Sequence, residues 1–322
     1  MKALVTGAAG FVGSTLCDTL LAAGHEVVGI DCFIDYYPRE LKERNLTAAL
    51  ANPRFRFVEA SLVNAPLADL LRGIDVVYHQ AAQAGVRASW GDDFRIYSDN
   101  NVFATQRLLE ACRAASLAKF VYASSSSIYG DTDDLPMRET SRPQPVSPYG
   151  VTKLAAEHLT WLYWKNYGLP TVSLRYFTVY GPRQRPDLAI HKFTRKLLAG
   201  EPLPVYGDGT TSRDYTYIDD IVDGVIRALE WTASAEPRYG IFNLGESRPV
   251  ELRRLVEVLE RATGTMAQRQ QLPMQAGDVE RTYADLALST AILGYRPSTD
   301  IEEGIDHFVK WYRAQQLGEG DF

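Results

Sequence analysis

Three side chains have the types and spacing needed for base catalysis. Ser125 lies in Ser-Ser-Ser-Ser-Ile-Tyr-Gly, and Tyr149 and Lys153 lie in Tyr-Gly-Val-Thr-Lys. A phenol with a pKa of about 10 is a weak base at neutral pH, and lowering that pKa by about 3 units takes about 4 kcal/mol of preferential stabilisation of the phenolate. A lysine ammonium one helical turn away can supply this stabilisation of the phenolate. These residues therefore predict proton removal from a hydroxyl group, coupled to hydride transfer.

The sequence before Tyr149 predicts the start of a helix. Ser147 can cap the first turn, Pro148 suits the first helical position, and an apolar pattern follows. Tyr149 and Lys153, four residues apart, then lie on one face of that helix. Ser125 follows a short apolar run at residues 120–123, which predicts a buried strand that ends in hydroxyl groups. We expect this strand end to lie near the helix in space.

The N-terminus decides whether the Tyr-x-x-x-Lys spacing has meaning, because a chain with 18 tyrosines can produce it by chance. Residues 2–6 predict a strand, and a glycine turn then leads into a helical segment closed by Gly24. Glycines allow a tight bend and close approach of a pyrophosphate, and a helix N-terminus favours anionic oxygens. The turn residues predicted to contact a dinucleotide are Gly7, Gly10, Phe11, Val12 and Gly13.

The second predicted strand, residues 25–30, is followed by Asp31, eighteen residues beyond Gly13. This spacing predicts a carboxylate that accepts hydrogen bonds from an adenosine ribose. A carboxylate repels a 2′-phosphate and no arginine follows it, so the sequence favours NAD over NADP. Lys42 can reach the same ribose. The alternative for Asp31 is a solvated residue at a strand end.

Strands and helices alternate through the first part of the chain. The alternation predicts a Rossmann-like, doubly wound parallel sheet of the α/β class, with ligands at the carboxyl ends of the strands. After the fourth strand, the segment Gln80-Ala81-Ala82 offers small side chains over which a cofactor can lie. The predicted strands are residues 2–6, 25–30, 55–59, 74–79, 120–123 and 171–176.

Beyond Phe177 the chain contains more Pro, Gly and Arg and no unbroken series of strong strands. We expect a smaller C-terminal substrate-binding domain there. The predicted division is a NAD-binding domain of residues 1–176 with a return segment at 217–245, and a substrate domain of 177–216 and 246–322. Helices are predicted near residues 101–114, 190–199, 219–231, 252–262 and 301–314.

Composition limits the class of protein. The 322 residues, 46% of them hydrophobic, can bury a full core. A net charge of -6 gives no general attraction to nucleic acid or anionic lipid, so neither partner is expected. Glycines interrupt the N-terminal apolar run, which argues against a secretory signal, and no run approaches the roughly 18 apolar residues of a membrane span. Three cysteines and five scattered histidines, without pairing or ligand spacing, predict a cytoplasmic protein without a metal site.

The motifs GAAGFVG, SSSSIYG, SPYGVTK and YGDGTTSRDYTYIDD resemble those of extended short-chain dehydrogenases/reductases of the nucleotide-sugar epimerase and dehydratase group. The resemblance runs nearly end to end. It implies NAD as cofactor, Ser125, Tyr149 and Lys153 as catalytic residues, and a C-terminal domain that binds a nucleotide sugar. Within the group, residues 84–90 and 177–187 are most similar to UDP-glucuronic acid 4-epimerases.

Further contacts are implied by the resemblance. Such enzymes meet the uracil, ribose and diphosphate at positions that correspond here to Lys192, Tyr206, Arg213 and Asp278. Arg213 can instead be a solvated or salt-bridged arginine, and Tyr206 a core aromatic. On the cofactor side, Ser61 and Leu62 stand where the group usually has an adenine-binding Asp, and Gln80 replaces a common Leu.

An acidic sugar agrees with the chemistry of Arg183 and Arg185. A guanidinium presents a planar fork of donors to a carboxylate. Oxidation at C4 of a glucuronosyl unit gives a β-keto acid, which loses carbon dioxide most easily when the bond to the carboxylate is perpendicular to the carbonyl plane. Arg185 and Thr178 are the first candidates to hold that bond out of alignment, with Arg87 and Ser89 as weaker ones. The alternative is that the arginines are surface charges or pair with acids such as Asp187.

The sequence therefore predicts an enzyme that converts UDP-glucuronic acid to UDP-galacturonic acid through a transient 4-keto intermediate. The rivals on the same scaffold are a UDP-glucose or UDP-N-acetylglucosamine 4-epimerase and a UDP-glucuronic acid decarboxylase. A rival of another class is a dinucleotide-binding regulatory protein without turnover. The resemblance also implies a homodimer paired through the helices at residues 101–114 and 149–167, although Trp161 and Trp164 can instead be buried within one chain.

Overall fold

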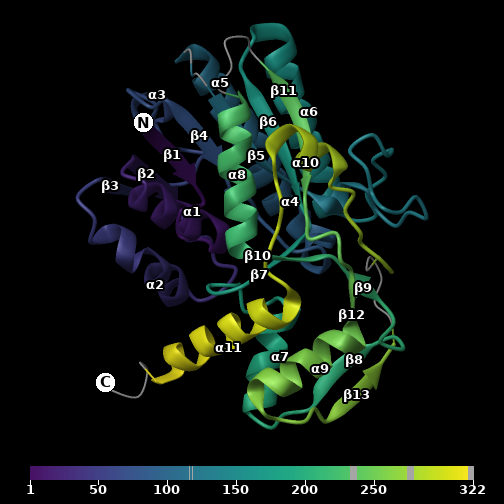
Figure 1. The fold of residues 1–322 in the computed structure, drawn as a ribbon. Coiled ribbons are helices and arrows are strands. Elements are labelled where there is room, and N and C mark those ends of the chain that lie inside the picture. The colour runs from purple at the N-terminus through teal and green to yellow at the C-terminus, as the bar shows by residue number, and fades with distance from the viewer. Residues whose placement is uncertain (116, 118, 233–237, 274–278, 318–322) are drawn as a thin grey trace.

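The protein is built around a seven-stranded sheet in which all neighbouring strands are parallel. The computed structural model describes residues 1–115, 117, 119–232, 238–273 and 279–317. The strand order is β11-β6-β5-β4-β1-β2-β3 (Figure 1). The strands are β1 Lys2–Thr6, β2 Glu26–Asp31, β3 Phe55–Glu59, β4 Val76–His79, β5 Lys119–Ser125, β6 Thr171–Tyr176 and β11 Tyr239–Leu244.

Alternating strand residues enter two separate cores, one on each face of the sheet. In β1, Ala3 and Val5 belong to the core beneath α1 and α8, whereas Leu4 belongs to the core beneath α3, α5 and α6. The sheet is therefore doubly wound, as the alternation of strands and helices predicts. The helices of the first core are α1 Phe11–Ala22 and α8 Ile218–Thr232, with α2 Arg39–Leu50 beside α1; those of the second are α3 Leu67–Leu70, α5 Ala104–Ala114 and α6 Pro148–Tyr167.

Several short helical elements complete the fold. The helix α4 Phe94–Tyr97 continues through a π-helical segment, Ser98–Phe103, into α5. Single 3₁₀ turns occur at Arg87–Ser89, Gly91–Asp93 and Ser126–Ile128, and α10 Ala287–Leu293 packs on α8 and β11.

The chain leaves the sheet after β6 and returns to it with α8 and β11 (Figure 1). The excursion and the C-terminal segment form a smaller body, in which α9 packs against α7 and α11. Its helices are α7 Ala189–Leu198, α9 Leu252–Thr263 and α11 Ile301–Leu317. Its two-stranded sheets are β7 Thr178–Tyr180 with β10 Tyr215–Tyr217, β9 Ser212–Arg213 with β12 Val250–Glu251, and β8 Leu203–Tyr206 with β13 Arg269–Leu272.

The start of α6 confirms a local prediction. Ser147 is the N-cap, its hydroxyl oxygen accepts a hydrogen bond from the Gly150 backbone N–H at 3.1 Å, and Pro148 opens the helix. The seventh strand, β11, was not predicted, because Gly240 and Asn243 weaken its strand pattern and its partner β6 lies far back in the sequence.

Candidate active site

A cavity of about 420 Å³ opens at the carboxyl ends of the central strands. It receives the glycine turn after β1, the end of β5, the first turns of α6 and the segment that leaves β6. This position is where parallel α/β sheets bind ligands. The predicted cofactor residues that line it are Gly7, Gly10, Phe11, Val12, Gly13, Asp31, Lys42, Leu62, Gln80, Ala81, Ala82, Tyr149 and Lys153, and the predicted substrate residues are Ser125, Thr178 and Arg185.

The glycine turn fits a dinucleotide phosphate. Gly7 has a φ of 69°, and a Cβ at this position would lie 2.9 Å from the backbone of Ala81. The helix α1 begins at Phe11 with Gly10 as N-cap and, within the described residues, with no side chain that caps it. Its first backbone N–H groups therefore lack intrahelical acceptors and face a cavity, which suits anionic oxygens.

Asp31 is placed to bind a ribose. Its carboxylate accepts hydrogen bonds from the backbone N–H groups of Phe33 at 2.9 Å and Ala9 at 3.1 Å, and it keeps further acceptor sites for hydroxyls. Burial raises the pKa of Asp31, while these hydrogen bonds and the Lys42 ammonium lower it. Lys42 lines the same cavity and donates to the Ile34 carbonyl. Asp31 and the glycine turn together fit NAD.

Ser61 is the one predicted cofactor residue that does not line the cavity. Its hydroxyl oxygen accepts a hydrogen bond from the Val63 N–H at 3.2 Å, and its carbonyl accepts from Asn64 and Ala65. Ser61 thus closes a turn, and the neighbouring Leu62 is the residue that reaches the cavity.

The structure brings Ser125, Tyr149 and Lys153 together in the cavity. All three residues line the cavity. Burial raises the pKa of Tyr149, whereas interaction with the Ser125 hydroxyl and the charge of Arg185 lower it. The pKa of Lys153 is lowered to about 7, because the effect of burial outweighs the opposing effect of the Glu157 charge. The side chains can pass a proton to or from a hydroxyl, and their catalytic roles remain predictions.

Arg185 lines the cavity and is also paired with an acid. Its Nε and Nη2 donate to the two carboxylate oxygens of Asp187 at 2.9 and 3.0 Å, and the Tyr36 hydroxyl donates to Asp187 at 3.2 Å. The ion pair with Asp187, which was one of the two alternatives from the sequence, is therefore present. The charge of Arg185 nevertheless lowers the pKa of Tyr149. Arg183 turns instead to Asp18 on α1, at 2.6 Å.

A second cavity of about 180 Å³ adjoins the first. The two share four lining residues: Val86, Ser126, Ser127 and Thr178. Arg213 lines the second cavity and donates to the carbonyls of Ser212 and Glu280 at 2.9 and 3.2 Å. Thr178 thus lies where the two cavities meet.

The other predicted substrate residues take different positions. The Arg87 guanidinium lies 4.9 Å from the centre of the Tyr206 ring, so these two residues come together. Ser89 is fully buried and its hydroxyl donates to the Val86 carbonyl at 2.7 Å. Lys192 is exposed on α7, and in the described part of the chain it lines neither cavity. Asp278 lies outside the described residues.

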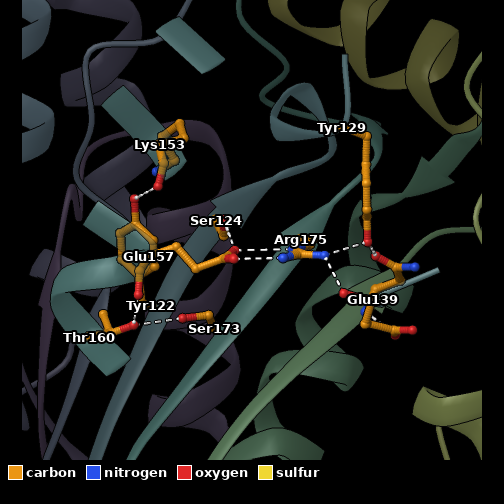
Figure 2. A network of polar contacts seen from close by, with 10 residues as sticks. Tyr122, Ser124, Tyr129, Glu139, Lys153, Glu157, Thr160, Ser173 and Arg175 are labelled. Carbon is orange, nitrogen blue, oxygen red and sulfur yellow. Dashed lines mark hydrogen bonds and ion pairs between the residues drawn. The ribbon is translucent and has the colours of Figure 1, made fainter. Parts of the chain in front are cut away.

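A buried polar network behind the cavity was not predicted (Figure 2). It centres on Glu157 of α6 and Arg175 of β6, whose side chains are 3% and 2% exposed. Two signals for it exist in the sequence: Glu157 follows Lys153 by four residues, and Arg175 is a charge inside an apolar strand.

No helix of the described residues is long and apolar enough to cross a bilayer. Within the same residues, no group of three or more His, Cys, Asp or Glu side chains could hold a metal ion.

Comparison with known proteins identifies relatives along the whole chain. A model of the NAD dependent epimerase/dehydratase family matches residues 3–245. The crystal structure of UDP-glucuronic acid 4-epimerase from Bacillus cereus in complex with UDP-glucuronic acid and NAD matches with a TM-score of 0.94 and 43% identity, over 98% of this chain and 100% of that one.

Two relatives found by sequence carry different names. The "uncharacterized UDP-glucose epimerase YtcB" of Bacillus subtilis (strain 168) is 43% identical, over 99% of this chain and 100% of that protein. The UDP-glucuronate 4-epimerase of Thermodesulfobacterium geofontis (strain OPF15) is 38% identical, over 96% of this chain and 95% of that protein.

Proposed function

The chain belongs to the NAD-dependent epimerase/dehydratase family, and on that premise we propose that it converts UDP-glucuronic acid to UDP-galacturonic acid by epimerisation at C4. One observation carries the choice of substrate. The Arg185 guanidinium lines the same cavity as Ser125, Tyr149 and Lys153. A single sugar can therefore place its carboxylate at the arginine and its C4 hydroxyl at the phenol.

The chain's own residues handle the proton. Tyr149 as phenolate takes the C4 hydroxyl proton, and Ser125 holds the two oxygens in line by hydrogen bonding. Lys153, one helical turn further along α6, stabilises the phenolate by its charge. NAD, when bound, supplies the acceptor for the C4 hydride and, once reduced, its donor. The 4-keto sugar would then turn its opposite face to the site, and Tyr149 would return the proton to the C4 oxygen as the ketone is reduced.

Arg185 and Thr178 protect the sugar carboxylate. The 4-keto intermediate is a β-keto acid, and its C–C bond to the carboxylate breaks most easily when it is perpendicular to the carbonyl plane. A guanidinium holds a carboxylate by two directed hydrogen bonds, which fixes orientation as well as position. Both residues line the cavity that holds Tyr149.

A neutral UDP-hexose is the second candidate substrate. The Asp187 carboxylate already binds both Nε and Nη2 of Arg185, which weakens the attraction of the guanidinium for a second carboxylate. The B. subtilis relative is named as a UDP-glucose epimerase. UDP-glucose is therefore the necessary comparison in any assay.

The test is turnover of UDP-glucuronic acid by the purified protein, followed by NMR without added NAD. We expect UDP-galacturonic acid as the sole product. A UDP-pentose with carbon dioxide would show a decarboxylase, and turnover of UDP-glucose alone would show the second candidate. If there is no product, the assay is repeated with added NAD, and inactivity on every UDP-sugar would support the regulatory alternative. Tyr149→Phe is the control for turnover by the proposed base.

We also propose that the protein is a cytoplasmic homodimer. Val151, Trp161 and Leu162 of α6 are 48%, 43% and 43% exposed, which supports an apolar contact with a second copy. Trp164, by contrast, stacks on Tyr239 of the same chain with ring centres 5.5 Å apart. All three cysteines carry free thiols, which supports a reducing compartment.

A further inference from the structure

An ion pair is buried between α6 and β6, behind the cavity. Arg175 donates from Nη2 to one carboxylate oxygen of Glu157 at 2.7 Å and from Nε to the other at 3.1 Å (Figure 2). A buried pair of this kind adds little net stability on average, because desolvation of both charges offsets their attraction. The role of the ion pair is therefore better judged from the residues that it contacts than from its contribution to stability.

The ion pair is hydrogen-bonded to both ends of residues 124–129, the segment that contains Ser125. The Ser124 hydroxyl donates to Glu157 at 2.7 Å, and Ser124 directly precedes Ser125 and lines the cavity. At the other end, Arg175 donates from Nη1 to the Tyr129 hydroxyl at 2.9 Å. Glu157 thus lies one helical turn from Lys153 and one hydrogen bond from the strand end that carries Ser125.

Among the described groups whose charge affects the pKa of Lys153, Glu157 is the only anion. The Lys153 ammonium lies 4.6 Å from the centre of the Tyr122 ring of β5, and His79 of β4 packs beside the same ring with ring centres 5.7 Å apart. Burial lowers the pKa of His79 to about 3 and raises that of Tyr122 well above its usual value, so both are neutral near pH 7. Tyr149, on the same helix, also has a raised pKa. From β6, Arg175 acts through Glu157.

We propose that Glu157, held in place by Arg175, is a positioning residue that keeps Lys153 in its ammonium form when the protein acts on its substrate. The inference rests on the proposed function, since that function gives Lys153 its role. If the pair only joined α6 to β6, removing the Glu157 charge would lower the amount of folded protein and leave the pH dependence of turnover unchanged.

The first test is the pH dependence of kcat for Glu157→Gln, which removes the charge and keeps one acceptor oxygen. We expect the titration limb of Lys153 to move by about one pH unit or more, which lowers its ammonium fraction at pH 7 at least about fivefold, from about one half to about one tenth. One limb of the profile should therefore move to lower pH and the other stay. Glu230→Gln, an equal charge change at an exposed position of α8, should move neither. Loss of kcat in a folded Glu157→Gln protein with both limbs unmoved would overturn the proposal.

A second measurement does not need turnover. NMR of protein labelled with carbon-13 at lysine Cε reports the titration of Lys153 directly, with Lys153→Met to assign its signal. The midpoint should lie at lower pH in Glu157→Gln than in the parent, and equal midpoints would overturn the proposal. If Glu157→Gln does not fold, E157Q/R175M removes both charges and should show the same direction of change. A parent without activity would refute the proposed function and leave this titration as the test of Glu157.

Discussion

Asp187 should set how strongly the site prefers an acidic sugar. In the structure, Asp187 engages two nitrogens of the Arg185 guanidinium, and its side chain is 29% exposed against 20% for Arg185. Burial alone would raise the pKa of Asp187, but Arg185 and Tyr36 hold it below its usual value, so Asp187 is ionised at neutral pH. A sugar carboxylate that binds Arg185 must share it with this charge. Asp187→Asn should therefore strengthen binding of UDP-glucuronic acid.

The size of the effect follows from the two contacts. Hydrogen bonds to charged groups contribute about 1.5–3 kcal/mol, and the asparagine carbonyl can replace one of the two acceptors. One of the two contacts, worth at least about 1.5 kcal/mol, then becomes available to the substrate, which is a factor of about ten in affinity. We expect the ratio of kcat/KM for UDP-glucuronic acid to kcat/KM for UDP-glucose to rise about tenfold, measured by NMR on both substrates.

The ion pair of the neighbouring Arg183 provides a matched control. Asp18 pairs with Arg183 at 2.6 Å, and in the described structure neither residue lines the cavity, so Asp18→Asn should leave the ratio unchanged. If Asp187→Asn keeps the thermal midpoint of the parent and the ratio of the two kcat/KM values stays level or falls, Asp187 does not compete with the sugar carboxylate for Arg185. Asp187 then orients Arg185 instead.

Three further results are expected. Tyr149→Phe should lower kcat by a factor of roughly 10² to 10⁴ while NAD still binds, measured by NMR turnover and by the absorbance of the bound cofactor; undiminished kcat would remove Tyr149 as the base. The pKa of Lys153, about 7, lies below its unfolded value of about 10.4, so the native state binds fewer protons between these values and the free energy of unfolding rises with pH by up to about 1.4 kcal/mol per unit. Lys153→Met lacks this rise, so in urea unfolding it should be more stable than the parent at pH 7, by a margin that is smaller at pH 9. An equal pH dependence of the two unfolding free energies would contradict the low pKa of Lys153. Trp161→Glu should convert the proposed dimer to monomers in analytical ultracentrifugation, and a dimer that persists would place the interface elsewhere.

Elements with strong local signals were predicted closely. The strands β1, β3 and β6 have the predicted bounds, and α6 begins where Ser147 and Pro148 indicate. These signals depend only on neighbouring residues. β11 was missed because its stability depends on tertiary contacts: Gly240 lies against the Trp231 ring, and Asn243 donates to the Met137 carbonyl at 2.9 Å.

The same contrast holds for the site. Strand ends and helix starts place Gly7, Asp31, Ser125 and Tyr149 in one cavity, so the spacing of motifs was sufficient there. The partners that set charge were not predictable in this way. The Arg175 guanidinium reaches from β6 to α6 and to the segment after β5, and only the folded sheet brings these three parts of the chain together. The pairing of Arg185 with Asp187 was one of two open alternatives, and deciding between them needed the loop geometry.

The place of β11 in the sheet has a consequence for synthesis. The strand pairs with β6, but the ribosome makes residues 177–238 between the two. At about 5 to 20 residues per second this takes roughly 3 to 12 s, during which the main-chain groups of β6 that later bind β11 lack their partner. Unpaired strand edges favour association with other chains. Each residue added between β6 and β11 therefore lengthens the interval in which a growing chain is open to aggregation.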